Sequence, residues 1–493
     1  MKLSELLRGV EVRAIDGPAD VEIAAVVADS RLVKPGSLFV AIAGFQTDGA
    51  KFVDAALQKG AAAVALECGG KATAFQATSV DVANARQALA LIAANFYGRP
   101  ADQLSLVGVT GTSGKTTTTK MIESIFDAGS EPVGLIGTIE YRAGDERLVA
   151  DRTTPDAVVL QEWFAKMRDA GVKHAVMEVS SHALALARTH GVRFAAAVFT
   201  NLSRDHFDFH KDFEDYYAAK RLLFDQIDCS KKTAIVNVDD EYGRRLAAEL
   251  GDCVVSFGRS PQAAIRPNDD FVIDVRGLRG IVTTPQGEVR VDSRLLGQPN
   301  LYNWLGAIGA ALAVGIPIPT IEAVIRELAA VRGRFERVDT EEGPTVIVDY
   351  AHKPDALEKL LHAVRDLARG RKVTLVFGCG GDRDKGKRPQ MGEIAARLAD
   401  EVVLTSDNPR NEKPQAIIDD IARGIAGTPP AQIVNRREAI ARAIEAASDD
   451  DVVLIAGKGH ESYQVIGDQI VHFDDREEAE LALKKRHEKA VSK

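Results

Sequence analysis

The sequence has few cysteines and no long apolar run. Its four cysteines show no C-x-x-C spacing: Cys68, Cys229, Cys253 and Cys379. This scatter argues against a cysteine zinc site and favours reduced thiols over a disulfide framework. No segment approaches the roughly 20 apolar residues of a membrane span. Charges stand in residues 1–8, where a signal peptide requires an apolar stretch. We therefore expect a cytoplasmic protein with no membrane partner.

An excess of basic charge is also missing. The chain has 62 Lys and Arg against 71 Asp and Glu, a net charge of -9. A nucleic-acid protein usually carries a broad basic surface, so no nucleic-acid partner is expected. Anionic small molecules remain possible ligands, because a few local cations suffice to bind them. With 493 residues, the chain is expected to form two to four globular domains.

The pattern of apolar runs divides the chain into three sections. Gly and Pro in Tyr97–Pro100 mark a first break, and a second falls near Val331–Arg334. Short β-rich runs such as Ser37–Ile42 come before Ala-rich helical stretches in the first section. Buried-strand candidates that alternate with helical stretches occupy residues 104–109, 174–179, 195–200 and 233–238, and then 345–348, 373–377, 401–404 and 451–455. This alternation predicts an α/β fold with parallel strands and crossover helices. The third section is expected to be doubly wound.

A glycine-containing loop follows the first strand of the second section. Residues 110–117 read Thr-Gly-Thr-Ser-Gly-Lys-Thr-Thr and precede a helical stretch. Glycines let successive backbone N–H groups turn inward around phosphate oxygens. Lys115 is expected to reach the terminal phosphates and Thr116 to ligate Mg²⁺. Val109 stands where the general motif has its first glycine, so the loop is a shortened variant. The expected ATP contacts are Gly111, Thr112, Ser113, Gly114, Lys115, Thr116 and Thr117.

A carboxylate ends the next strand candidate. Glu178 follows the apolar run that begins at His174, and loops at such strand ends gather ligands in open α/β sheets. Oxygen ligands suit Mg²⁺, so Glu178 and Thr116 could share one ion. A helix-capping or ion-paired carboxylate remains the alternative interpretation.

The loop Thr110–Thr117 resembles the ATP loop of the Mur ligases, which build the peptide of the bacterial cell wall and have folylpolyglutamate synthase as a relative. Further motifs resemble that family in the family's order, over essentially the full length: Met177–His182, Asn201–His206, Asp349–Pro354 and Ala456–Glu461. Asp407–Arg410 resembles the motif of the branch that adds meso-diaminopimelate, and the lysine-adding branch usually differs there.

The resemblance implies three domains. These are a uridine-nucleotide-binding α/β domain over 1–99, a P-loop ATPase-like parallel-sheet domain over 100–332 and a Rossmann-like, amino-acid-binding domain over 333–493. The implied substrates are ATP, UDP-MurNAc-L-Ala-D-Glu and meso-diaminopimelate, joined through an acyl phosphate by a cytoplasmic monomer. A lysine-adding ligase, a folylpolyglutamate synthase-like ligase and a non-catalytic nucleotide-binding module are the alternatives.

The resemblance also implies roles for single residues. His206 would join a second metal site, and Lys220 would be carbamylated by CO₂ and offer an oxygen ligand. Taken alone, Lys220 would be a surface lysine. With Lys115 and Glu178 these two form the expected catalytic set. Asn303 would lie near the adenine, Arg334 would reach the γ-phosphate and Asp349 the ribose.

Two further ligand sets complete the expectation. The UDP-precursor contacts would be Ser30, Gln46, Thr153, Thr154, Ser180 and Arg188; alone, Ser30 and Gln46 are ordinary turn residues. Diaminopimelate has a second amino-acid end, so its ligase should offer a bidentate Arg and a carboxylate. Arg410 and Glu461 suit those roles, and Arg383 would add a clamp. The remaining implied contacts are Asp407, Asn408, Pro409 and Gly457.

Overall fold

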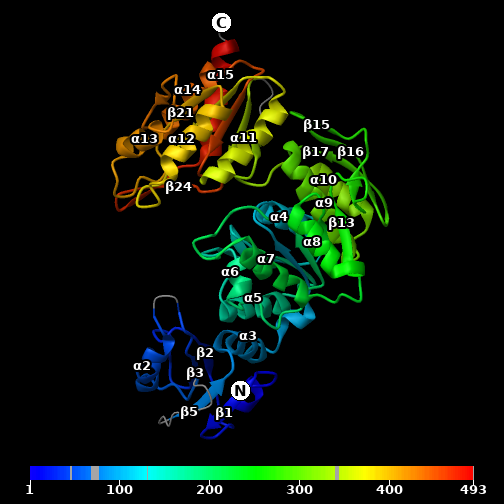
Figure 1. Ribbon diagram of the computed structural model, residues 1–493, viewed down its shortest axis with the longest axis vertical. Coiled ribbons are helices and arrows are strands. Elements are labelled where there is room, and N and C mark those ends of the chain that lie inside the picture. The colour runs from blue at the N-terminus through cyan, green and yellow to red at the C-terminus, as the bar shows by residue number, and fades with distance from the viewer. Residues whose placement is uncertain (45–46, 68–76, 130, 339–342, 492–493) are drawn as a thin grey trace. The chain divides into compact units, whose positions relative to one another are not determined.

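The computed structural model describes residues 1–44, 47–67, 77–129, 131–338 and 343–491. The chain forms two compact units, Met1–Ile265 with Gly306–Pro317 and Arg266–Leu305 with Ile318–Lys493. Three α/β regions follow one another along the chain, as the alternation of apolar runs predicts (Figure 1). Within the described ranges, no helix has the length and apolarity needed to cross a bilayer.

The N-terminal region is a five-stranded sheet in the order β1-β5-β4-β3-β2. Strands β2 to β5 run parallel, and β1 pairs antiparallel with β5. The strands are β1 Val12–Asp16, β2 Ala25–Val27, β3 Ser37–Val40, β4 Ala63–Leu66 and β5 Thr78–Val82; the helices are α1 Leu3–Leu6, α2 Val53–Gln58 and α3 Ala85–Phe96. Asn84 caps α3, because its side chain accepts hydrogen bonds from the N–H groups of Arg86 and Gln87.

The central sheet has eight strands in the order β13-β12-β11-β6-β10-β7-β8-β9. The first six are parallel, and β8 and β9 turn back antiparallel. The strands are β6 Ser105–Thr110, β7 Val133–Ile136, β8 Glu140–Ala143, β9 Glu146–Val149, β10 His174–Glu178, β11 Ala196–Phe199, β12 Ala234–Asn237 and β13 Val254–Phe257. The four strands expected in this section are therefore confirmed. Because β6 lies between β11 and β10, the loops that follow these three strands gather at one sheet edge.

Helices connect the parallel strands of this sheet. They are α4 Lys115–Asp127, α5 Ala157–Asp169, α6 Ser181–Ala185, α7 Phe213–Arg221 and α8 Glu241–Leu250. Helix α4 starts directly after the glycine loop, and α6 directly after β10. Both helices thus begin at the edge where the loops gather.

A small antiparallel sheet opens the second unit, and the alternation of apolar runs did not predict it. Strand β16 pairs with β14, β15 and β17. The elements are β14 Arg266–Pro267, β15 Val272–Asp274, β16 Gly277–Thr284, β17 Gly287–Ser293, α9 Gly297–Ala313 and α10 Ile318–Glu327. Helix α10 is tied to β17 by a hydrogen bond from the Arg290 N–H to the Glu322 carboxylate (2.7 Å).

The C-terminal sheet has six strands in the order β18-β19-β23-β20-β21-β22, all parallel except β18. The strands are β18 Glu336–Val338, β19 Thr345–Asp349, β20 Val373–Phe377, β21 Glu401–Leu404, β22 Ala431–Gln432 and β23 Val452–Ala456, with a hairpin of β24 Tyr463–Ile466 and β25 Gln469–His472. The helices are α11 Pro354–Ala368, α12 Lys387–Leu398, α13 Pro414–Ala422, α14 Arg436–Ala446 and α15 Asp475–Val491. All four strands expected here are confirmed. The loops after β20, β21 and β23 meet at one edge.

The cysteines correct one expectation. Cys229 and Cys253 form a disulfide, although reduced thiols were expected. The two residues are 24 apart in sequence, but their Cα atoms lie 4.8 Å apart, because β12 and β13, which they precede, are neighbouring strands. Cys379 is free and buried, and Cys68 lies outside the described residues.

Candidate active site

The glycine loop is held against the end of β11. Gly111 has φ +148°, and a Cβ there would lie 1.9 Å from Thr200 Oγ1, so only glycine fits. Gly114, with φ +83°, precedes the first residue of α4. The Ser113 N–H donates to Asn201 Oδ1 (3.0 Å). The loop is thereby fixed at a helix N-terminus, where N–H groups and the helix dipole favour an anion.

Two lysines meet at one carbonyl of this loop. Lys115 Nζ donates to the carbonyl oxygens of Gly111 and Thr112, each at 2.9 Å. Lys220 Nζ, from α7, donates to the same Gly111 oxygen at 2.7 Å. The structure therefore brings Lys115 and Lys220 together, although they are 105 positions apart in the sequence.

Glu178 lies at the same edge, and 1% of its surface is exposed. Thr116 Oγ1 donates to its Oε2 (3.0 Å), as does Thr138 Oγ1 (3.1 Å). The Thr138 N–H donates to Oε1 (2.8 Å). The expected pair of Thr116 and Glu178 is in direct contact, and the Thr138 contribution was not foreseen. The sequence position of Thr138 could have indicated its role, because Thr138 follows β7, the strand next to β10 in the sheet.

Lys220 is buried, with 1% of its surface exposed. Its Nζ lies 4.4 Å from the centroid of the Tyr216 ring. Burial lowers the pKa of Lys220 well below its ordinary value, and the nearby Lys115 lowers it further. The amine is thus disposed to be neutral, and a neutral amine can react with CO₂.

His206 lies in a cluster of rings at the start of the 206–210 segment. Its φ is +58°, a conformation that non-glycine residues rarely adopt. Its ring lies 4.8 Å from that of His182 and 6.3 Å from that of Tyr216. Tyr216 is thus near both His206 and Lys220. Nearby, buried His210 contacts Ser181 Oγ (2.9 Å) and Asp215 (3.1 Å).

No group of three or more His, Cys, Asp and Glu side chains within the described ranges is placed to hold a metal ion. A magnesium ion here would need oxygen atoms from Thr116 and Glu178 together with a ligand's own oxygens. The buried Thr116–Glu178 pair has this hard-oxygen chemistry.

The residues expected to contact the UDP precursor are partly connected to Glu178. Thr154 Oγ1 donates to the Glu178 carbonyl (2.8 Å), and Arg188 Nη1 donates to the Thr154 carbonyl (2.7 Å). The Ser180 N–H donates to Thr154 Oγ1 (3.1 Å). Burial lowers the pKa of Arg188, and neighbouring Arg152 adds to this effect, so a ligand anion would relieve local repulsion.

The remaining precursor residues are more scattered. Thr153 Oγ1 lies 3.1 Å from Thr138 Oγ1, so it belongs to the Glu178 network. Ser30 lies in the N-terminal region, where its carbonyl accepts a hydrogen bond from Lys59 Nζ (2.9 Å). Gln46 lies outside the described residues.

Three expected ATP contacts belong to the second unit. The Asp349 carboxylate accepts hydrogen bonds from the N–H groups of Phe335 (2.7 Å) and Ala351 (2.8 Å), and burial raises its pKa. The Arg334 guanidinium lies 4.7 Å from the Tyr350 ring centroid, and its buried Nε has no hydrogen-bond partner among the described residues. Asn303 is buried and donates to Asn300 Oδ1 (3.1 Å).

The two C-terminal motif loops, after β21 and β23, interlock with each other and with the loop after β20. The Gly381 N–H donates to the Asn408 carbonyl (2.9 Å), and Arg410 Nη1 donates to the Gly381 carbonyl (2.9 Å). Asn408 Nδ2 donates to Glu461 Oε2 (2.9 Å). A Cβ at Gly457 would lie 2.8 Å from the buried Asp407 carboxylate. The structure therefore gathers the expected residues Asp407, Asn408, Pro409, Arg410, Gly457 and Glu461.

Arg383 is the exception, because its side chain is exposed on the loop after β20. Close to it, buried Arg388 donates to both oxygens of Glu412 (2.8 and 3.0 Å) and to the Gly380 carbonyl (3.3 Å). These hydrogen bonds hold the pKa of Glu412 at about 2. Arg388 braces the loop that carries Arg383, and no sequence pattern indicated this role.

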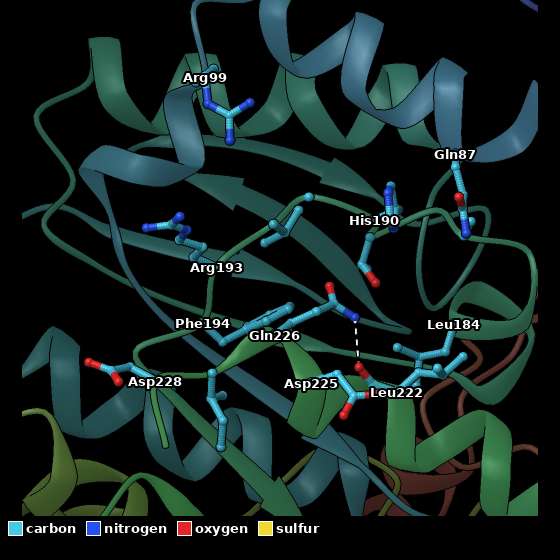
Figure 2. A pocket seen from close by; sticks show the side chains of 15 residues that line it. Gln87, Arg99, Leu184, His190, Arg193, Phe194, Leu222, Asp225, Gln226 and Asp228 are labelled. Atoms are coloured by element: carbon cyan, nitrogen blue, oxygen red, sulfur yellow. Dashed lines mark hydrogen bonds between the residues drawn. The ribbon is translucent and has the colours of Figure 1, made fainter. Parts of the chain in front are cut away.

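A separate cavity of about 840 Å³ lies in the first unit (Figure 2). Its lining includes Gln87 of α3, Arg99, His190, Arg193 and Asp225, and none of the expected site residues. Both signs of charge line the cavity, so the lining points to no single class of ligand.

The central sheet has a glycine loop of the phosphate-binding type at its carboxyl edge, and the C-terminal sheet has interlocked loops at its own. This combination is typical of multidomain nucleotide-dependent enzymes. Models of Mur ligase domains match three segments: "Mur ligase family, catalytic domain" over residues 22–97, "Mur ligase middle domain" over 109–311 and "Mur ligase, glutamate ligase domain" over 333–459.

Similar proteins cover almost the whole chain. UDP-N-acetylmuramoyl-L-alanyl-D-glutamate--2,6-diaminopimelate ligase of Gloeobacter violaceus is 47% identical, over 99% of both chains. The protein of that name in Geobacter metallireducens is 44% identical, over 98% of both. A solved structure of such a ligase has a TM-score of 0.72 and 32% identity, over 99% of both chains. The chain belongs to the Mur ligase family of ATP-dependent, amide-bond-forming ligases.

Proposed function

We propose that this enzyme uses ATP to join meso-diaminopimelate to the D-Glu carboxylate of UDP-MurNAc-L-Ala-D-Glu in peptidoglycan precursor synthesis. The observation that carries the proposal is the similarity, at 44–47% identity over nearly the full length, to ligases named for this reaction. The gathered side chains of the two loops that contain Arg410 and Glu461 support it.

In the central site, the chain's own groups position the phosphoryl group. The γ-phosphoryl of ATP passes to the D-Glu carboxylate to give an acyl phosphate, and the diaminopimelate amine then displaces phosphate. Lys115, released from the Gly111 and Thr112 carbonyls, would donate to the transferring phosphoryl oxygens. The N–H groups at the start of α4 would stabilise charge that grows in the transition state. No covalent bond to the protein is needed, so catalysis here is positioning and electrostatics.

Two groups that the resemblance implies fit this site. Thr116 and Glu178 would hold Mg²⁺, with His206 and a carbamate on Lys220 at a second ion; magnesium neutralises phosphate charge. The buried amine of Lys220, whose pKa is lowered, suits reaction with CO₂. A carbamate keeps one N–H on Nζ, so the hydrogen bond from Lys220 to the Gly111 carbonyl is compatible with the modification.

The other substrates would use the remaining sets. Arg188 would pair with an anionic group of the precursor, while Thr153, Thr154 and Ser180 would contact its sugar and peptide, and Ser30 and Gln46 its uridine end. Asn303, Arg334 and Asp349 remain proposed ATP contacts, and the Nε of Arg334, which has no hydrogen-bond partner among the described residues, supports its role as a donor. Arg410 and Arg383 would hold the distal carboxylate of diaminopimelate, and Glu461 its ammonium.

The test is ATP turnover by the purified chain with UDP-MurNAc-L-Ala-D-Glu and each diamino acid in turn. We expect phosphate release and an amide product with meso-diaminopimelate and little of either with lysine. A preference for lysine would refute the substrate assignment. Turnover with folate and glutamate would refute the reaction.

Three further expectations belong to this proposal. We place the reaction in the cytoplasm, where ATP is supplied, and expect a monomer, which light scattering of the purified chain would test. We also keep the domain boundaries 1–99, 100–332 and 333–493.

A further inference from the structure

Lys458 is a buried cation at the edge where the C-terminal loops meet. None of its surface is exposed. It belongs to the loop after β23, between Gly457 and Glu461, and its Nζ lies 5.6 Å from the Tyr463 ring centroid. A fully buried lysine needs partners that offset its desolvation. Those partners are two residues proposed to bind diaminopimelate.

The ammonium of Lys458 joins the two motif loops. Its Nζ donates to Asn408 Oδ1 (3.2 Å) and to Glu461 Oε2 (3.2 Å). Asn408 Nδ2 donates to the same Oε2 (2.9 Å), and Asn408 Oδ1 also accepts the Val465 N–H (3.0 Å). The amide of Asn408 therefore cannot flip without losing these bonds.

Both donors use one oxygen of the Glu461 carboxylate. Within the described residues, Oε2 accepts from Lys458 and Asn408, and no group donates to Oε1. Two charge-assisted or polar bonds on one oxygen fix the rotation of the carboxylate. The other oxygen is thus presented in one direction.

We propose that Lys458 is a positioning residue of the amino-acid site, which orients Glu461 so that Oε1 receives the distal ammonium of the incoming diamino acid. The inference rests on the proposed function. Lys458 does not contact the ligand in this scheme; it acts through Glu461. It also offsets the charge of Glu461, with which it forms an ion pair (3.2 Å).

The test compares two amino acids that differ only in that ammonium. L-2-Aminopimelate has the reacting amine and the distal carboxylate of diaminopimelate but lacks the distal ammonium. We expect the unchanged enzyme to prefer diaminopimelate about 10- to 100-fold in kcat/KM, the range for a hydrogen bond to a charged group. In Lys458→Met, we expect this preference to fall to about threefold or less. This preference should fall because KM for diaminopimelate rises in the variant. Its kcat and its KM for ATP should change little.

Lys372→Met is the matched control, because Lys372 pairs with Glu401 at the amino ends of β20 and β21, away from the loops. It should keep the full preference. If Lys458→Met retains the full preference, or raises KM for all substrates equally, Lys458 has only a structural role and the proposal fails. If Lys458→Met does not fold, Lys458→Gln carries the same comparison. Absence of diaminopimelate turnover by the unchanged enzyme would instead refute the proposed function.

Discussion

The proposed phosphate site of the central region and the proposed amino-acid site of the C-terminal region differ in what their polar groups contact. In the central site, the groups expected to act on ligands are bonded to the loop itself: Lys115 and Lys220 both donate to the Gly111 carbonyl. In the C-terminal site, Asn408, Lys458 and Glu461 hold one another in a fixed arrangement with one carboxylate oxygen left over.

The difference follows from the ligands. Triphosphate is highly charged and comes with metal ions, so Lys115 would gain much stronger bonds by exchanging its carbonyl partners for phosphate oxygens. A zwitterionic amino-acid end is neutral overall and offers fewer strong contacts, so preorganisation matters more there. Variants in the central site should thus act on the chemical step, and variants in the C-terminal site on binding and stability.

The largest effect is expected for Lys115→Ala. The variant removes the donor proposed to stabilise the transferring phosphoryl group, and loss of one such donor reduces kcat by about 100- to 1000-fold. Lys120→Ala, five residues along α4, is the control. Lys120 pairs with Glu123 and Glu140, so its loss should change kcat by about twofold at most. Equal activity of the two variants would remove the assigned role of Lys115.

An effect of similar size, on stability, is expected for Arg436→Met, because Arg436 supports the C-terminal motif loops. Arg436 and Asp475 form a fully buried pair. The guanidinium also donates to the carbonyls of Ser406 (3.3 Å), just before the Asp407–Arg410 motif, and of Ala456 (3.0 Å), the first residue of the Ala456–Glu461 motif. Arg436→Met leaves Asp475 buried and unpaired, which should cost about 3 kcal/mol of the free energy of unfolding.

Urea unfolding of the Arg436→Met variant would measure this loss. The variant is also expected to have a higher KM for diaminopimelate, because both motif loops start at the carbonyls to which Arg436 donates hydrogen bonds. Unchanged stability would mean that the second unit tolerates the buried charge, and the contrast with the central site would weaken.

Arg410→Met should have a smaller and more selective effect. A diaminopimelate carboxylate left without its bidentate partner costs about 2 kcal/mol, or about 30-fold in KM. Lysine lacks this carboxylate, so its turnover should change little and the preference for diaminopimelate should shrink. Steady-state assays with both amino acids test this, and an equal loss for both would argue against selective recognition by Arg410.

Much of this molecule could be predicted from local patterns, and the rest depended on distant contacts. Buried strands such as Val373–Phe377 are short apolar runs, and the glycine loop reads directly from its residues. The antiparallel β16–β17 hairpin was missed because its signal, the turn residues around Gly287, is short and lies in a section otherwise read as alternating strands and helices.

The site shows the same division. Lys115 and Glu178 were predicted because Lys115 stands in a glycine loop that follows a strand and Glu178 ends a strand. The burial of Lys220 against Gly111, 109 residues away, leaves no mark on its own helix. The expectation of reduced thiols was wrong for Cys229 and Cys253 for the same reason, since strand pairing brings these two residues together.

Per pH unit, Lys220 gives the smallest expected effect, and this effect is on the pH dependence of stability. An unfolded lysine titrates near its ordinary value of 10.5, whereas burial places the pKa of Lys220 well below that in the folded chain. Between the two pKa values, the unfolded chain binds a proton that the folded chain does not. The stability of the unchanged protein therefore rises with pH across this window, by up to about 1.4 kcal/mol per pH unit from this group.

Lys220→Met removes the titrating amine but keeps an apolar stem of similar length. In CO₂-free buffer at about pH 8, we expect the variant to have a larger free energy of unfolding than the unchanged protein. This difference should shrink as the pH rises toward 10.5. Urea unfolding at several pH values measures the difference between the two proteins. A difference that stays constant with pH would mean that Lys220 keeps its proton in the folded state. A protonated amine does not attack CO₂, so that result would also remove the chemical basis for a carbamate at this position.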